Sequence, residues 1–540
     1  MVETRPGADG TRMDEGTKAR KPPTKTADAG KAPRRVWQAA VARIYALACA
    51  TVAITATSAV TRAAALCGIA YVEVLVRQNR RLPGEPPVVW SWVPLLGSAV
   101  AFGRAPLEWL RSNAADSGSD VFVATVAGER TAFVTDASLW PKVLREPASR
   151  LEFRSIGMDV TEKAFGVPRR DVADAFEDAT DKVAHQQFVR CLQHPEHIGA
   201  LTRAATTALE ASLPRLGDAA GAKAMPLFAT LAEPLWVATM TALTGAGAFA
   251  TAACYSDFKA FDAKFAFLAG GAPLGAYPAA AAALRRLAGR FGTDANYQGR
   301  DESVSDLLRS RKALFEACEA GAGRAWDPAS HGKIQTTMVW AAAANTIPAA
   351  LWATYWLARD ATARARVVAD VLAGLRRTEG DVPAALDDDT AFPVVDAAIS
   401  EALRLATASL TVRRVTVDDY VLPGSTLKLR KRDRVALYPP LVHFDAAKVG
   451  PDPRAFVLDR YLAEPKTPLM PFGGGISLCP GRKFARREIK AFLVVLLKTY
   501  DVALADPAAP VPQSDPSRVG LGVIGPAPGA DAAATFKRRA

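Results

Sequence analysis

Apolar and polar positions divide the chain into an uncharged early stretch, a short alternating region and a long helical region. Residues 44–61 carry no charge and lie between Arg43 and Arg62, and a second apolar run covers residues 63–72. These 18 uncharged residues just reach the span of a bilayer core. A signal peptide and an organelle transit sequence share this pattern, but we favour a membrane anchor over residues 44–76.

The segments on either side of this stretch are polar. Residues 1–43 form a basic tail that we expect to be largely disordered. The tail is too long for an ordinary signal peptide, and acidic residues such as Glu3 and Asp9 argue against a transit sequence. Residues 77–87 are basic and rich in proline, which predicts a stiff, extended hinge before a large domain over residues 88–540.

The large domain begins with alternating segments and continues with helical periodicity. Residues 121–126 and 131–135 flank a turn that contains Gly128, which predicts a β-hairpin. From about residue 137 to residue 400 the pattern is helical, and short strands follow over residues 410–440. The predicted fold class is mainly α with small β-sheets.

Composition and charge narrow the function. The 540 residues carry a formal charge of +12, which favours an acidic partner or an anionic membrane surface. The sequence has no motif typical of nucleic-acid binding, so we expect no nucleic-acid partner. Its six cysteines are scattered, which fits neither a disulfide framework nor a zinc site and favours a reducing compartment.

One cysteine lies in a distinctive setting. Cys479 follows three consecutive glycines, Gly473–Gly475, and precedes a helical pattern that opens with Pro480. A lone cysteine is most often a small buried apolar residue. At a helix N-terminus, however, the dipole and the backbone N–H groups favour a thiolate, which is a suitable axial ligand for haem iron.

A helix expected over residues 331–359 contains a stretch of small side chains. Ala341–Ala344 have no bulk, so a flat ligand can lie against them, although a close helix–helix contact has the same pattern. Asn345 and Thr346 form a polar pair beside Pro348, which should weaken the helix at this point.

Glu401 and Arg404 are three residues apart on a predicted helix, where they can pair. Such a pair is usually a solvated surface contact. Its neighbours here are apolar, which indicates a buried pair that needs a further partner, and Arg460 is the candidate.

Residues 266–278 form an apolar loop. It fits contact with a membrane, the gate of a channel or a packed turn equally well.

Together these motifs resemble the cytochrome P-450 family over residues 83–540. The Cys479 loop, the alanine-rich helix, and Glu401 with Arg404 and Arg460 stand in the order that the family requires. The sequences of residues 344–348, 409–413 and 436–439 are similar to those of sterol 7α- and 12α-hydroxylases and prostacyclin synthase. The resemblance implies a single haem-binding domain with an N-terminal anchor.

Two departures from the general family pattern support this narrower group. No carboxylate stands at Ala344 or Asn345, where most members place an acid before a threonine. An amide orients water but does not supply a proton as a carboxylic acid does. Ser477 replaces the basic residue that usually contacts a haem propionate, so Arg413 becomes the candidate for that contact.

The resemblance implies a monooxygenase that inserts one oxygen atom of O2 into a C–H bond of an apolar substrate, a sterol or oxysterol. The alternative is a haem-thiolate isomerase or dehydratase of a lipid peroxide, which needs no reductase. A non-enzymatic haem sensor or carrier is the least favoured reading. Reducing equivalents are expected from NADPH through a separate flavoprotein reductase. The domain would face the cytoplasm from the endoplasmic reticulum membrane, in contact with lipids.

The resemblance also assigns roles to residues. Cys479 is the expected ligand of the iron in haem b, and Asn345 and Thr346 are the expected catalytic residues. The expected cofactor contacts are Phe472, Gly473, Gly475, Arg413 and Arg482. The substrate pocket is expected to include Ala341, Ala344, Ser409, Leu410 and Thr411. Basic side chains after the cysteine, Arg482, Lys483, Arg486, Arg487 and Lys490, suit docking of an acidic reductase or form an ordinary solvated helix face.

Overall fold

The computed structural model describes residues 32–539, apart from residues 56–57, 214–215, 217–222, 248, 295–296, 299–302 and 465–466, and it describes side chains from residue 42 onward. Most of the tail predicted to be disordered therefore lies outside the described residues. Helix α1 (Ala32–Thr55) begins inside that predicted tail. Proline in the first turn, followed by arginine, alanine and glutamine, favours a helix there.

The chain divides into two compact units, Met1–Val76 and Arg77–Ala540. The first contains α1 and most of α2 (Ala59–Gln78). Within the described residues, α2 and α11 (Leu227–Thr244) are long and apolar enough to cross a membrane. Most of α11 is buried in the core of the second unit, whereas α2 is largely exposed. The pattern thus favours α2 as the anchor.

The predicted hairpin is confirmed as β1 (Val121–Val126) and β2 (Glu129–Val134), which pair antiparallel. Ala127 and Gly128 connect them with φ angles of 50° and 81°. Positive φ at both central residues is the geometry of the common two-residue hairpin turn.

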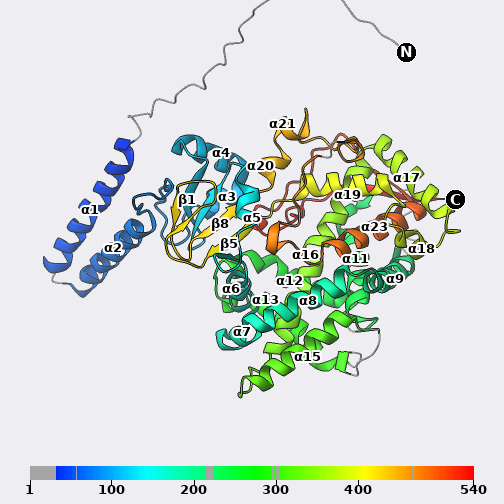
Figure 1. Cartoon of the computed structure of the whole chain (residues 1–540), viewed down its shortest axis with the longest axis horizontal. Helices are drawn as coiled ribbons and strands as arrows, with labels where there is room; N and C mark the ends of the chain where they lie inside the picture. The colour runs from blue at the N-terminus through cyan, green and yellow to red at the C-terminus, as the bar shows by residue number, and fades with distance from the viewer. Residues whose placement is uncertain are drawn as a thin grey trace, which may run out of the picture. The chain divides into compact units, whose positions relative to one another are not determined.

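The hairpin belongs to a five-stranded sheet in the order β1-β2-β8-β5-β3, which Figure 1 shows at one side of the helices of the second unit. The pair β2–β8 is parallel and the other pairs are antiparallel. The remaining strands of this sheet are β3 (Leu151–Glu152), β5 (Thr411–Val415) and β8 (Arg434–Leu437). The strands predicted after residue 410 thus lie beside the early hairpin.

Two smaller sheets complete the β-structure of the described residues. One has the order β4-β10-β9, from β4 (Met225–Pro226), β9 (Tyr500–Leu504) and β10 (Ala533–Arg538). The other pairs β6 (Tyr420–Val421) with β7 (Lys428–Leu429).

Helices make up most of the second unit. The core-forming ones are α9 (Pro195–Ser212), α11, α16 (Ser330–Arg359), α19 (Pro393–Ala406) and α23 (Arg482–Thr499). The others before α16 are α3 (Ala99–Arg104), α4 (Pro106–Ser117), α5 (Trp140–Leu144), α6 (Arg154–Phe165), α7 (Arg169–Ala175), α8 (Asp178–Gln193), α12 (Ala252–Ala269), η2 (Leu274–Ala276), α13 (Pro278–Thr293) and α15 (Asp306–Gly321). After it come α17 (Ala361–Arg376), α18 (Val382–Asp387), α20 (Pro440–His443), α21 (Ala446–Val449), α22 (Asp459–Leu462), η3 (Gly475–Ser477) and η4 (Pro516–Arg518).

The segment predicted to be a hinge is fixed to the sheet by Glu85. This carboxylate is 3% exposed and accepts hydrogen bonds from Arg130 and Arg430, each at 2.9 Å. Arginine pairing, together with a backbone N–H bond, lowers the pKa of Glu85 against the opposing effect of its burial, which is the largest single effect. Residues 77–87 are therefore part of the second unit rather than a free spacer.

The apolar stretch over residues 266–278 runs from the end of α12 through η2 to the start of α13. Leu274 and Tyr277 pack against a cluster that includes Phe165, Phe261 and Phe265. Phe267 remains 48% exposed. Most of residues 270–278 are also exposed, so the packed-turn interpretation covers only part of the segment, and contact with a membrane and a channel gate stay predictions.

Candidate active site

The Cys479 loop approaches β5 and the end of α5 closely. Gly473 and Gly475 have φ angles of 72° and 62°, where glycine is favoured. A Cβ atom on Gly475 would lie 2.1 Å from the carbonyl oxygen of Leu144 and 2.5 Å from Arg413 Nη2. The loop closes when Cys479 N–H donates to the carbonyl of Phe472 at 3.0 Å. The close contacts of Gly475 mean that only glycine fits at position 475.

The thiol of Cys479 lies just before α23, which begins at Arg482, so Pro480 precedes the helix instead of lying in its first turn. Burial raises the pKa of the Cys479 thiol, whereas the backbone N–H of Gly481 and the charge and N–H of Arg482 act to lower it. The lowering of the thiol pKa that a helix N-terminus favours is therefore present, but burial raises the pKa by more. Coordination to a metal would reverse the balance, because a coordinating thiol is deprotonated.

Arg413 is a buried cation whose partners are carbonyl groups. It is 2% exposed, its Nη2 donates to the carbonyl of Gly474 at 2.9 Å and its Nη1 to that of Leu144 at 3.2 Å. Burial lowers the pKa of its guanidinium. Within the part of the chain that the structure describes, no carboxylate lies within ion-pair distance of it. A buried charge of this kind needs an anion beside it.

Three buried polar atoms around this loop have no hydrogen-bond partner among the described residues: Arg413 Nε, Thr411 Oγ1 and Ser477 Oγ. A Cβ on Gly473 would lie 3.5 Å from Thr411 Oγ1, so the loop and β5 meet here. Unpaired buried polar atoms point to a missing polar ligand. Together with the thiol, they fit a haem whose propionates would contact Arg413 and Ser477.

Two other predicted cofactor residues also lie in the loop region. Phe472 is partly buried against the main core. Arg482 donates from Nη1 to the carbonyl of Cys479 at 3.1 Å, so it stabilises the loop backbone itself.

Helix α16 presents Asn345 on its more open side. Ala341, Asn345 and Pro348 recur at helical spacing and are less buried than Ala343, Ala344 and Thr346. Thr346 is 6% exposed and follows Asn345 by one residue, so it points in another direction. The structure thus separates the two residues that the sequence analysis paired. Pro348 does not end the helix, which continues to Arg359.

Asn345 is held by the C-terminal segment. Its Oδ1 accepts the backbone N–H of Val523 at 3.0 Å. A Cβ on Gly522 would lie 1.9 Å from this oxygen. Ala408 and Leu410 in turn donate backbone N–H groups to Gly522 and Gly520. The predicted pocket segment around Ser409 and Leu410 is therefore joined to Asn345 through residues 520–523. Ser409 Oγ is buried without a partner among the described residues.

Glu401 and Arg404 form the predicted buried pair, each fully buried, with Arg404 Nε donating to Glu401 Oε2 at 2.7 Å. Arg460 joins them through Nη1 at 2.5 Å from Glu401 Oε1. The surface interpretation is wrong at this position, because apolar neighbours cover the pair.

His443 was missed by the sequence analysis and connects this group to the Cys479 loop. Its carbonyl accepts Arg404 Nη1 at 2.6 Å, and its Nε2 accepts the backbone N–H of Met470 at 3.0 Å. Burial and the charge of Arg404 lower the pKa of His443 to about 3, so the ring is neutral. No motif surrounds this residue, and only the three-dimensional contact shows its role.

Comparisons with known proteins agree with this geometry. A family model described as cytochrome P450 matches residues 332–528. Cytochrome P450 7A1 of Oryctolagus cuniculus is 31% identical over 83% of this chain and 93% of its own length. Cholesterol 7-alpha-monooxygenase of Cricetulus griseus is 31% identical over 84% and 94%. The 5-beta-cholestane-3-alpha,7-alpha-diol 12-alpha-hydroxylase of Sus scrofa is 28% identical over 86% and 95%. None of these three carries the name of an isomerase or dehydratase.

Proposed function

Because the chain belongs to the cytochrome P450 family, as a haem-dependent monooxygenase supplied with electrons from NADPH, we propose that it hydroxylates a sterol or oxysterol. The observation that carries the proposal is the match over nearly the whole length of relatives named for sterol hydroxylation. A 7α-hydroxylation is the favoured reaction, since the relatives with the higher identity include a cholesterol 7-alpha-monooxygenase.

We assign the cofactor contacts to residues of the Cys479 loop and β5. Cys479 would ligate the iron, and Arg413 with Ser477 would bind the propionates. When bound, haem supplies the oxidising chemistry, and a thiolate ligand favours cleavage of the O–O bond. The role of the protein is to hold the cofactor, position the substrate and control water.

Asn345 would act as a hydrogen-bond donor on the substrate side. Since Oδ1 is occupied by the N–H of Val523, the Nδ2 group is the part left to bind another molecule. This group can hold a water molecule or a substrate oxygen in place. It cannot supply a proton as a carboxylic acid does, so protons must reach the site through water.

The pocket residues suit a rigid apolar ligand. Ala341 leaves room on the open side of α16, whereas Ala344 is buried in the core, and Leu410 adds apolar surface. Ser409 Oγ is unpaired among the described residues and can bind a hydroxyl or oxo group. A sterol combines a large apolar body with one or two such groups.

A membrane location follows from the N-terminal helices. Helix α2 is apolar and largely exposed, and α1 contributes a shorter apolar run over Ala42–Thr55. We propose that this region anchors the enzyme in the endoplasmic reticulum membrane, with residues 88–540 as the cytoplasmic catalytic domain and a flavoprotein reductase as partner. Sterols partition into membranes, so an anchored enzyme lies next to its substrate.

The test is incubation of the purified holoenzyme with a panel of sterols and oxysterols, with and without reductase and NADPH, followed by mass spectrometry. A product with one added oxygen, formed only in the complete mixture, would support the proposal. Consumption of a lipid peroxide without any cofactor, and no sterol product, would instead favour the isomerase.

A further inference from the structure

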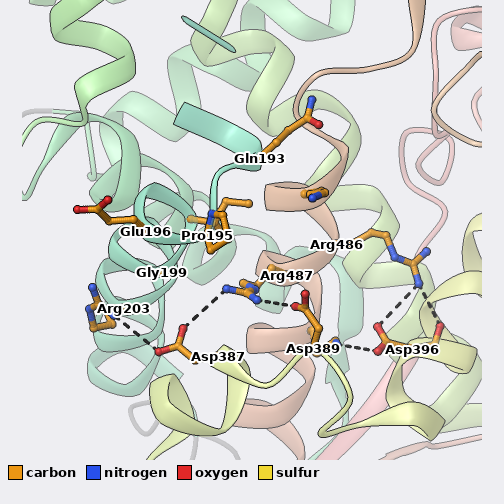
Figure 2. A pocket seen from close by; sticks show the side chains of 13 residues that line it. Gln193, Pro195, Glu196, Gly199, Arg203, Asp387, Asp389, Asp396, Arg486 and Arg487 are labelled. Carbon is orange, nitrogen blue, oxygen red and sulfur yellow. Dashed lines mark hydrogen bonds and ion pairs between the residues drawn. The ribbon is translucent and has the colours of Figure 1, made fainter. Parts of the chain in front are cut away.

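A surface cavity of about 780 Å³ lies beside the Cys479 loop, between the start of α9, the segment from Asp387 to Asp396, and α23 (Figure 2). Gln193, which lines it, donates from Nε2 to the carbonyl of Pro480 at 3.0 Å. Pro480 follows Cys479 directly, so a partner docked on this cavity would lie on the cysteine side of the fold.

The charge of this cavity differs from the sequence expectation. Its lining has five cationic side chains, Arg203, Lys483, Arg486, Arg487 and Lys490, and four acidic ones, Glu196, Asp387, Asp389 and Asp396. The basic side chains that α23 contributes are therefore nearly balanced by carboxylates in the same cavity. Glu196 lies on α9, Asp387 ends α18, Asp389 follows it and Asp396 lies on α19.

Among the acidic residues of this cavity, Asp396 pairs with Lys490 and Arg486. It lies in the first turn of α19 and accepts Lys490 Nζ at 2.6 Å, while Arg486 lies 3.8 Å away. Lys490 is only 8% exposed, and Arg486 also donates to Ser400 Oγ at 2.9 Å. Asp396 is thus shared by two cations, and its own side chain is only 29% exposed.

Asp387 and Asp389, which we call the acidic segment, are more exposed than Asp396. Figure 2 shows Arg487 between them, with Nη2 2.5 Å from Asp389 and Nη1 3.8 Å from Asp387. Asp387 also lies 3.8 Å from Arg203. The two carboxylate side chains are 53% and 87% exposed, whereas that of Arg487 is 13% exposed. Exposed carboxylates are held weakly and exchange readily for others.

We propose that the acidic segment is an internal competitor, which occupies Arg487 and Arg203 until carboxylates of the reductase displace it. This inference rests on the proposed function, because it assumes an electron-donating flavoprotein with an acidic surface. Displacement would free two guanidinium groups next to the exposed Lys483. The resulting positive cluster would attract the partner and orient it towards the Cys479 loop.

The test is the affinity of the holoenzyme for a purified flavoprotein NADPH reductase. The double variant Asp387→Asn with Asp389→Asn should bind the reductase about three- to tenfold more tightly at low ionic strength. The gain should shrink at high ionic strength, because salt screens exposed charges. The matched control is Asp418→Asn with Asp419→Asn, which removes two exposed, lysine-paired carboxylates just before β6. The control should leave the affinity unchanged.

A second comparison tests the exchange itself. Arg487→Gln should weaken reductase binding more in the double variant than in the wild-type background, because Arg487 is free there to contact the partner. Equal affinity in the wild type and the double variant would overturn the inference, as would weaker binding by the double variant.

The reduced carbon monoxide spectrum and turnover distinguish failure of the competitor from failure of the proposed function. If the wild type has a thiolate-type spectrum and turns over with the reductase, but the variants bind like the wild type, only the competitor is wrong. If the wild type neither binds the reductase nor accepts electrons from it, the proposed function fails and the competitor with it.

Discussion

The side-chain oxygen of Asn345 accepts the backbone N–H of Val523 at 3.0 Å. Since a backbone N–H can only donate, this contact fixes the orientation of the amide, with Oδ1 as the acceptor and Nδ2 as the donor. One residue thus takes a defined rotamer from a segment 178 residues away in the chain. The donor on the substrate side depends on the conformation of Gly522 and Val523.

Gly522→Ala should disturb this arrangement. The added Cβ would lie 1.9 Å from Asn345 Oδ1, and the φ of Gly522 is 154°. We expect about a tenfold lower turnover and more NADPH consumed per product, because the amide is displaced by roughly an ångström. The measurements are haem content, product per NADPH and the spectral shift on sterol binding.

The matched control is Gly529→Ala, which has a φ of 82° and no atom within 4 Å of its added Cβ. It should add strain of its own at a positive φ without moving Asn345. If both variants form equally less product per NADPH consumed, Gly522 does not act by positioning Asn345.

Glu401→Ala should prevent stable haem incorporation. It leaves Arg404 and Arg460 without their carboxylate, and loss of one partner of a buried pair costs about 3–5 kcal/mol. The effect should reach the Cys479 loop through His443 and Met470. The measurements are the haem-to-protein ratio and the free energy of unfolding in urea.

Asp459→Ala provides the comparison for that variant, because it breaks an exposed pair with Arg366 beside Arg460. Its cost should stay below about 1 kcal/mol. Normal haem content in the Glu401 variant would show that the buried group does not support the cofactor.

Glu488 should make stability depend on pH. Burial raises its pKa from 4.5 to about 7, opposed by the hydrogen bond with Thr239. The folded state therefore binds the proton more tightly than the unfolded state. The stabilisation is complete below pH 4.5 and is lost as the pH rises to about 7, a change of about 3 kcal/mol.

Glu488→Gln should remove this slope, because the amide stays neutral at every pH. The measurement is the free energy of unfolding between pH 5.5 and 8, compared with Glu210→Gln at an exposed pair with Lys498. If the free energy of unfolding of the Glu488 variant changes with pH as in the wild type, other groups cause the pH dependence.

Cys479→Ala should abolish the thiolate-type spectrum of the reduced protein with carbon monoxide. The matched control is Cys318→Ala, which removes a partly buried thiol that contacts Thr180. The control should keep both the spectrum and the haem. Survival of the spectrum without Cys479 would place the ligand elsewhere.

Local patterns account for what the sequence predicted correctly. The hairpin at Gly128, the long helix with Pro348, and the pair Glu401–Arg404 each depend on neighbours within a few residues. The surrounding apolar positions were enough to indicate that the pair is buried. Arg460, 59 residues from Glu401, was a candidate because a buried pair needs a further partner.

Contacts between distant segments account for what the sequence missed. Nothing near His443 indicates that it receives the N–H of Met470, and nothing near Asn345 indicates Val523. The basic pattern on α23 was real, but the carboxylates that neutralise Arg487 come from residues about a hundred positions earlier, such as Asp389. Charge patterns along one helix do not show which charges face it.

The central claim is that this chain inserts an oxygen atom from O2 into a sterol. The most direct measurement is mass spectrometry of the sterol product formed by the holoenzyme, reductase and NADPH under oxygen-18 gas in ordinary water. The account predicts one oxygen-18 atom in each product molecule, and none when the label is in the water instead. A product that carries oxygen from water, or that forms without O2, would contradict it.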